Sequence, residues 1–522
     1  MAIHGAGQRP DVVLFMVDQL SAKWLEEPYR SCISSPNIDR LQADGVTFTR
    51  AFSSNPICMA ARPTIATGLT ARSHGVLTNG YRLDSRIPTF MQLLQRENWR
   101  TGAFGKVHFY PHFMGVHPDY RPFGFDECFV TEDPRAGEWL DWLSREHPQH
   151  FEAALATIWP TEISELKSYG DDGINLSKRI KEVRASFNLS TKEFPQNDPG
   201  AYTLPFPAEV SQTEWITGHA VDFIRSVDRN QPIFAHVSYV QPHSPFCPPA
   251  EYVRRVDRNA MFEPVPIEWL EDPAVPDWFD DSEGARRSIP SDWQRRRQHY
   301  FADIMHLDHQ LGEVISTLKD SGRLETTYVI FISDHGELLF DHGFTGKAER
   351  HYDACVRVPL IISGPGVRAG TTSDLTIQHE DIFPTVLDMT GIAAPEPQVL
   401  GPYLKESPEY LPGKSLLGQC RGEKPESWRE VAYIESYNNI GTALPIHWAR
   451  TVRTNRWRYT LYPDGAGEQL FDMVNDLDEQ KNLVRDKSYA DIRQTMRDLL
   501  LEKVILQDYP LPVTDLFAIG VH

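Results

Sequence analysis

The sequence predicts an α/β protein with a mostly parallel sheet and helices on both faces, followed by a smaller α+β subdomain that contains an antiparallel sheet. The run "DVVLFMVDQL" is apolar almost throughout, which is typical of a strand buried on both faces of a parallel sheet. Helical patterns and apolar strand patterns then alternate along most of the chain, as expected when helices cover both faces of such a sheet. Towards the C-terminus, "EVAYIESY" and "HWARTVRTNRWRYTLYP" alternate polar and apolar residues, which favours antiparallel strands.

The order of the elements follows from the same periodicities. Helices are expected at "SPNIDRLQADG", "IPTFMQLLQREN", "GHAVDFIRSV", "DIMHLDHQLGEVISTLKDSG", "DIFPTVLDMTG" and, near the C-terminus, "YADIRQTMRDLLLEKVI". The strands expected between them are "TGAFGK", "FAHVSYVQPH", "TTYVIFISDHGE" and "VRVPLIIS". Another helix is expected around Pro63, which has no backbone N–H to donate. Only in the first turn of a helix does this cost no hydrogen bond, so we expect that helix to begin near Met59 or Ala60.

A chain of 522 residues is too long for one hydrophobic core. We expect a large domain over residues 1–424, with long insertions at about 133–212 and 245–295, and a smaller subdomain over residues 425–522. The apolar tail "LQDYPLPVTDLFAIGVH" suggests an arm that reaches a partner subunit, so the sequence predicts a homo-oligomer.

Composition excludes several classes of partner. The formal net charge of -20 argues against nucleic acid and against anionic membrane surfaces, because both need basic protein surfaces. The N-terminus lacks a secretory pattern, and no apolar run approaches membrane-spanning length. The six cysteines are scattered without the spacing of a zinc site or a disulfide framework, so we expect a reduced, cytoplasmic protein.

Polar residues gather where the predicted strands end. In an open parallel sheet, ligands bind beyond the carboxyl ends of the strands, so these residues are expected to face one crevice. They are Asp18, Gln19, Lys106, His108, His243, Asp334 and His335. The metal candidates among them are Asp18, Gln19, Asp334 and His335, whose carboxylate, amide and imidazole groups suit calcium first, with magnesium or manganese open.

A second group of residues predicts an anion site in this acidic chain. Lys106 and Lys347 are point charges able to hold an anionic group. Arg62 follows Cys58 by four residues, so both lie on one face of a helix whose N-terminus also attracts anions.

At this point the sequence resembles the type I sulfatases of the alkaline phosphatase superfamily. "CMAAR", followed by "PTIATG" and "ARSHG", is similar to the signature of these enzymes. "DVVLFMVDQ", "GKVH", "QPHSPF", "FISDHGELLFDHGFTGK", "VRVPLII" and "QLFDMVNDLDEQKNL" fall in the order of the family, from about residue 10 to 485. The resemblance implies an alkaline-phosphatase-like α/β domain followed by a smaller domain with an antiparallel sheet.

The resemblance also implies a mechanism for a small anionic ester substrate. A maturation enzyme would convert Cys58 to formylglycine, whose hydrated aldehyde would attack sulfur or phosphorus once a divalent ion lowers its pKa. Lys106 and Lys347 would stabilise the transferring group, and His243 would protonate the leaving oxygen. His108 would deprotonate the second hydroxyl, Arg62 would orient the diol, and Asn79 resembles a substrate-contacting asparagine of the phosphonate monoester hydrolases.

Three positions depart from the usual sulfatase pattern. Ala60 stands where maturation enzymes usually meet proline. The pairs Asp18-Gln19 and Asp334-His335 replace Asp-Asp and Asp-Asn, as in the phosphonate monoester hydrolases, whereas "GKVH" is similar to sulfatases proper.

These features leave several functions open. The first is a sulfate-ester hydrolase with side activity on phosphonate monoesters and phosphodiesters, and the second reverses that preference. A third is a non-catalytic relative that binds a metal or an anion and carries an inert Cys58. A variant of the third makes the Cys58 thiolate itself the nucleophile.

Overall fold

The structure, a computed structural model, describes residues 9–111, 116–158, 176–187, 200–281, 284–395, 411–437, 448–463, 465 and 467–507. Within these ranges, eight strands form a central sheet in the order β10-β2-β9-β7-β1-β6-β4-β5. Their bounds are β1 (Asp11–Val17), β2 (Gly45–Phe48), β4 (Arg100–Gly105), β5 (Glu127–Val130), β6 (Ile233–Ser238), β7 (Thr327–Ser333), β9 (Leu360–Ser363) and β10 (Thr371–Ser373). β9 runs antiparallel to both of its neighbours, and the remaining pairs are parallel, which confirms the predicted mostly parallel sheet.

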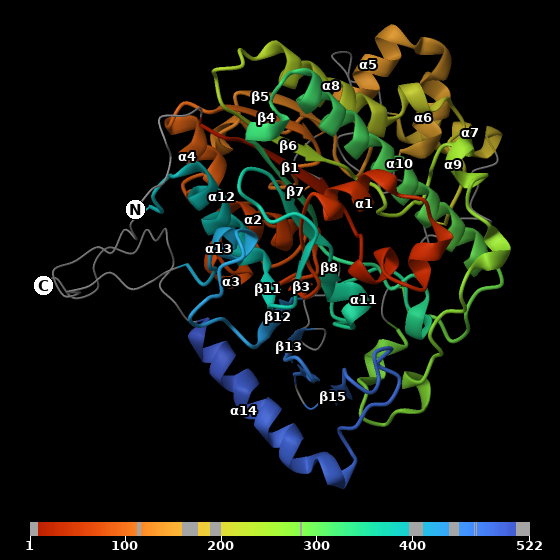
Figure 1. Cartoon of the computed structure of the whole chain (residues 1–522). Helices are drawn as coiled ribbons and strands as arrows, with labels where there is room; N and C mark the ends of the chain where they lie inside the picture. Colours follow the sequence, from red (N-terminus) through yellow and green to blue (C-terminus); the bar gives the residue numbers. More distant parts are fainter. Residues whose placement is uncertain are drawn as a thin grey trace, which may run out of the picture.

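Both faces of this sheet are covered by helices, because each strand has two apolar faces. On β1, Val13 and Phe15 pack into one hydrophobic core while Leu14 and Met16 pack into the other. The helices that pack into the first core include α1 (Pro36–Ala43), α8 (Gln212–Ser226) and α10 (Trp293–Asp320), and those of the second include α2 (Cys58–Thr67), α4 (Phe90–Arg96) and α12 (Ile382–Thr390). Figure 1 shows the two groups on opposite sides of the strands.

Three sequence predictions need correction at their ends. α2 begins at Cys58, before the expected start, and continues through Pro63; every residue of this helix is buried, so tertiary packing outweighs the lost hydrogen bond. The strand expected to reach His243 ends at Ser238, before the prolines that cannot donate to a ladder. The strand expected at "VRVPLIIS" is interrupted at Pro359, which separates β8 (Arg357–Val358) from β9.

The described residues of the two predicted insertions form mainly short helices and turns. The first contains α5 (Glu138–Glu146), α6 (Phe151–Thr157) and α7 (Ser177–Ser186), and the second contains α9 (Ala250–Val253) and several 3-10 turns. In Figure 1 the helices α5, α6 and α7 lie together at the end of the molecule opposite the C-terminal sheet.

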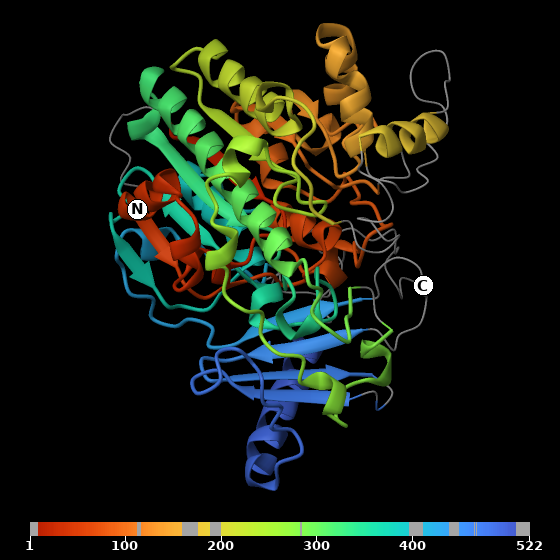
Figure 2. The same cartoon turned by 90° about the vertical axis from the view of Figure 1, so that its right-hand side faces the viewer.

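The C-terminal part contains the predicted antiparallel sheet. Its strands are β12 (Ala432–Ser436), β13 (Ala449–Arg453), β14 (Trp457–Tyr462) and β15 (Gly467–Asp472), in that order. α14 (Ala490–Leu506) packs against β13 and β14, and Figure 2 shows this layer beneath the main body. The domain boundary near residue 425 stays a prediction, and the tail predicted to be an arm lies beyond residue 507, outside the described residues.

Hydrogen bonds tie the C-terminal sheet to the chain just before α2. The backbone N–H of Glu435 donates to the Ser54 carbonyl at 2.9 Å. Gln378, at the end of β11 (Ile377–Gln378), donates its amide to the Ser54 hydroxyl at 3.1 Å and to the Tyr433 carbonyl at 2.7 Å. The Ser54 hydroxyl in turn donates to the buried carboxyl of Glu380. These contacts hold the segment from which α2 starts.

Membrane insertion finds no support in the helices that the structure describes. None of them combines the length and the apolar character that a bilayer crossing requires.

Gly105 lies so close to the backbone of the neighbouring strand β6 that a larger residue there should lower the stability of the protein. Gly105, the last residue of β4, has a φ of +91°, and a Cβ there would lie 1.9 Å from the Ser238 carbonyl oxygen. Gly105→Ala should therefore destabilise the protein by about 3 kcal/mol or more, measured by urea unfolding. The matched control is Gly218→Ala in α8, where no described atom lies within 4 Å of the added Cβ and a gain of about 1 kcal/mol is expected. Equal midpoints for the two variants would contradict this packing.

The buried Glu380 predicts a pH dependence of stability. Burial raises the pKa of its carboxyl from 4.5 to about 7, so the folded protein keeps the proton to higher pH than the unfolded chain does. The free energy of unfolding should therefore fall as pH rises from about 4.5 to 7, by about 3 kcal/mol from this group. Glu380→Gln should remove that part of the slope in denaturant titrations at pH 5 and pH 8. A slope unchanged by this variant would contradict the assignment.

Candidate active site

The N-terminus of α2 brings Cys58 to the carboxyl ends of the central strands. Ile57 caps the helix without a side-chain hydrogen bond, and Gly68 ends it in the left-handed region at φ 70°. The chain before the helix is anchored by Ser53, whose backbone N–H donates to the Val356 carbonyl at 2.8 Å and whose hydroxyl donates to the Asp334 carbonyl at 2.7 Å. The N-terminus of this helix therefore points its partial positive charge into the site.

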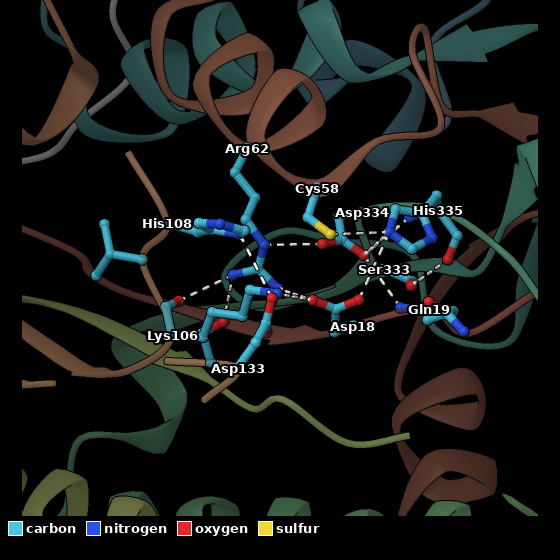
Figure 3. A network of polar contacts seen from close by, with 12 residues as sticks. Asp18, Gln19, Cys58, Arg62, Lys106, His108, Asp133, Ser333, Asp334 and His335 are labelled. Atoms are coloured by element: carbon cyan, nitrogen blue, oxygen red, sulfur yellow. Dashed lines mark hydrogen bonds and ion pairs between the residues drawn. The ribbon is translucent and has the colours of Figure 1, made fainter. Parts of the chain in front are cut away.

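Arg62 lies one turn after Cys58 and contacts the ends of four neighbouring strands. Its Nε donates to Asp334 Oδ2 at 2.7 Å, and its Nη2 to Asp18 Oδ2 at 3.3 Å. Its Nη1 donates at 2.9 Å to both the Lys106 carbonyl and the Ser238 hydroxyl. Three of these partners directly follow β7, β1 and β4, and Ser238 is the last residue of β6. Because the four strands are adjacent in the sheet, one guanidinium fixes α2 to the whole crevice (Figure 3).

Lys106 lies between two carboxylates. Its ammonium donates to Asp18 and to Asp133, and all three side chains are buried. Burial works against the charged form, but these carboxylates raise the pKa of Lys106 well above its ordinary value. Burial likewise opposes the charge of Asp18, yet Lys106 and the other nearby cations hold the pKa of Asp18 below its usual range. Both groups are therefore ionised across the physiological range.

Cys58, Lys347 and His335 form a close triangle. The Lys347 ammonium lies 2.7 Å from Cys58 Sγ and 2.9 Å from His335 Nε2, and that ring nitrogen lies 3.4 Å from the sulfur. His335 Nδ1 lies 3.0 Å from the Gly336 carbonyl, so Nδ1 carries the proton and Nε2 presents a lone pair to the site. Burial lowers the pKa of His335 to about 4, which keeps the ring neutral.

These groups fit a divalent cation. Donor atoms of Asp18, Cys58, Asp334 and His335 lie within 4.8 Å of one another, and all four residues are buried. Asp18 Oδ1 accepts no hydrogen bond from the part of the chain that the structure describes, so one buried carboxylate oxygen stays available. Gln19 lies beside this cluster: its backbone N–H donates to Asp334 Oδ1 at 3.1 Å, and its amide nitrogen donates to Glu337.

The remaining predicted residues lie at different distances from this centre. His108 is buried, with Nδ1 3.9 Å from Asp133 Oδ2, and forms a second group of potential ligands with Cys58 and Asp133. His243 is buried, and its Nδ1 lies 2.7 Å from the Ser244 carbonyl. Asn79 lies half-buried in the loop after α3 (Ala71–His74), and its role as a substrate ligand stays a prediction.

Sequence reasoning missed two residues of this network. Asp133 pairs with Lys106, and Ser238 accepts from Arg62. Neither had a clear signal in the sequence: Ser238 lies inside a strand that is expected to continue to His243, and Asp133 follows β5 in "CFVTED", a strand that the periodicity did not single out.

Three cations and three carboxylates meet at this centre. Arg62, Lys106 and Lys347 supply the positive charges. Asp18, Asp133 and Asp334 balance them. An arrangement of this kind can hold a divalent cation on one side and an anionic group on the other, beside a potential nucleophile at residue 58.

Comparison with known proteins identifies the family of this chain. The family model described as Sulfatase matches residues 10–392, and a model described as N-sulphoglucosamine sulphohydrolase, C-terminal, matches residues 340–505. An arylsulfatase of Clostridium perfringens is 26% identical over an alignment of 522 positions, gaps included. The alignment covers 95% of this chain and 94% of that protein. A choline-sulfatase of Rhizobium meliloti is 26% identical over 505 residues, covering 92% of this chain and 83% of that protein.

A solved structure shows the same fold. The phosphonate monoester hydrolase of Agrobacterium radiobacter superposes with a TM-score of 0.72 at 26% identity, and the match covers 96% of each chain. The family model covers most of the chain and includes the residues from Asp18 to Asp334 that build the crevice. The chain belongs to the sulfatase family of hydrolases, with the alkaline-phosphatase-like fold.

Proposed function

We propose that this protein hydrolyses sulfate esters by means of a formylglycine made from Cys58 and a divalent cation. The observation that carries the proposal is the position of Cys58, at the N-terminus of α2 and within contact of Lys347 and His335. A buried thiol with an ammonium, an imidazole and two carboxylates around it has little use as a packing residue. The arylsulfatase and choline-sulfatase relatives support sulfate as the transferred group.

The cation would be held by Asp18, Asp334 and His335, with Gln19 beside them. Calcium is our first choice, and the imidazole leaves manganese and magnesium as alternatives. When bound, the cation would supply positive charge that lowers the pKa of a hydroxyl at residue 58. A formylglycine-generating maturation enzyme would have to accept Ala60 two positions after Cys58.

Each of the other residues in the crevice has a separate role in the proposed reaction. Arg62 orients residue 58 because its guanidinium is fixed by four strand ends and cannot readily exchange a proton. Lys106 and Lys347 stabilise negative charge on the oxygens of the transferring group. His243, whose Nδ1 contacts the Ser244 carbonyl, would donate a proton from Nε2 to the leaving oxygen as the general acid. His108, near Asp133, accepts a proton in the second step.

A second function is favoured by specific residues. Asp18-Gln19 and Asp334-His335 follow the pattern of the phosphonate monoester hydrolases, and the solved enzyme of that activity from Agrobacterium radiobacter shares the fold. Hydrolysis of phosphonate monoesters or phosphodiesters, with sulfate esters as the side activity, is therefore the alternative. A cytoplasmic location and a homo-oligomer remain predictions from the sequence.

One comparison of kcat/KM distinguishes a sulfate-ester hydrolase from a phosphonate monoester hydrolase. Protein matured in a host that makes the maturation enzyme should show a mass at the Cys58 peptide that corresponds to formylglycine. Its kcat/KM should be higher on 4-nitrophenyl sulfate than on a 4-nitrophenyl phosphonate of equal leaving group. The opposite order would replace the first function by the second. An unmodified thiol in native protein, with neither ester hydrolysed, would support the non-catalytic alternative.

Substitution of the nucleophile tests the mechanism. Cys58→Ala should lower kcat/KM by about 10⁴-fold or more, because it removes the proposed nucleophile that contacts Lys347 and His335. Cys32→Ser is the matched control: this half-exposed cysteine directs its thiol to the Ala260 carbonyl and belongs to neither group of potential metal ligands, so activity should be unchanged. Loss of activity on alkylation of the free thiol would instead identify the Cys58 thiolate as the nucleophile.

A further inference from the structure

The unmodified side chain of Cys58 gives the cation cluster a sulfur donor that a formylglycine lacks. We propose that the chain with unmodified Cys58 binds a zinc ion through Cys58, His335, Asp18 and Asp334, and that conversion of Cys58 turns this site into one for harder divalent cations. Zinc binding needs only the encoded cysteine, whereas the change of selectivity also rests on the proposed conversion to formylglycine.

The spacing of the donor atoms fits tetrahedral zinc. His335 Nε2 lies 3.4 Å from Cys58 Sγ, 3.5 Å from Asp18 Oδ1 and 3.6 Å from Asp334 Oδ1. Zinc bonds of about 2.3 Å to sulfur and about 2.1 Å to nitrogen and oxygen give tetrahedral edges of about 3.4–3.6 Å. The remaining pairs of donor atoms lie within 4.8 Å, so small side-chain rotations complete the set.

Each donor is already prepared for a cation. The Gly336 carbonyl holds the Nδ1 proton of His335, so the Nε2 lone pair faces the other donors, as outer hydrogen bonds arrange it in known metal sites. Asp18 Oδ1 is buried and accepts no hydrogen bond from the described residues. The Lys347 ammonium, 2.7 Å from the sulfur and 2.9 Å from Nε2, shows that this pair of atoms attracts a cation.

The exchange of partners balances without a redox step. A Zn–S bond forms as the S–H bond of Cys58 breaks and its proton leaves to solvent, and the Lys347 ammonium gives up its contacts with the sulfur and with His335 Nε2. The thiolate adds one negative charge to a centre whose three carboxylates and three cations otherwise balance. That extra charge and the softness of sulfur both favour zinc over calcium.

Conversion of Cys58 removes the soft donor. The ligands left are carboxylate oxygens, an imidazole and oxygens at residue 58, which suit calcium, magnesium or manganese. The chemical state of one side chain would then set which metal the same carboxylates hold. In unconverted protein, zinc would occupy this metal site in place of weakly bound calcium.

Metal titration of unconverted protein tests this inference. Full-length protein is made in a host without the maturation enzyme, and the thiol at residue 58 is verified by mass. Competition with a chromophoric chelator should show one zinc ion per chain. Cys58→Ser should weaken zinc binding by about 100-fold or more, and Cys32→Ser should leave it unchanged. Cobalt(II) should give a sulfur-to-metal charge-transfer band that is lost in Cys58→Ser and in the converted protein.

Two results would overturn the inference. One is zinc binding that is equally tight in the wild-type chain and Cys58→Ser; the other is a cobalt spectrum of the wild-type chain without the charge-transfer band. The second needs no variant, so it decides the matter even if Cys58→Ser does not fold. Hydrolysis is measured only on converted protein, so a failure of the proposed function leaves the zinc result intact, and the reverse holds as well.

Discussion

The guanidinium of Arg62 is the interaction on which the rest of the site depends. It bonds to groups at the ends of β7, β1, β6 and β4, four strands that are adjacent in the sheet. Planar, permanently charged and rich in donors, an arginine can make these contacts at once where a lysine could not. Together with the anchored chain before α2, this side chain one helical turn away fixes the position of Cys58 relative to the metal candidates.

Burying so many charges is stable only because they are matched. An isolated ion in the protein interior costs several kcal/mol, and that cost returns whenever one partner of a buried pair is removed. Lys106 between Asp18 and Asp133 illustrates the balance, since the pKa of Lys106 rises and that of Asp18 falls despite burial of both. The balance leaves a centre with nearly no net charge, which can accept a cation and an anion side by side. This resolves how a chain of net charge -20 could bind an anionic ester.

Much of this arrangement could be predicted from the sequence because parallel strands deliver their carboxyl ends to one edge. Asp18, Lys106 and Asp334 follow apolar runs directly, and the structure brings all three to Arg62. Asp133 could not be found in this way, because its strand β5 is short and only half-buried, so its pattern is weak. The start of α2 was also misplaced: propensity disfavours Pro63 inside a helix, and only the tertiary packing of α2 outweighs that preference.

The central claim is that residue 58 is a modified nucleophile facing a cation held by Asp18, Asp334 and His335. A crystal structure of protein purified from its native host, with anomalous diffraction data to identify the metal, tests it most directly. The account predicts density for a diol in place of the sulfur of Cys58 and a single cation bonded to those three side chains. The account would be contradicted by density for a sulfur atom at residue 58 that still contacts the Lys347 ammonium, with no cation beside it.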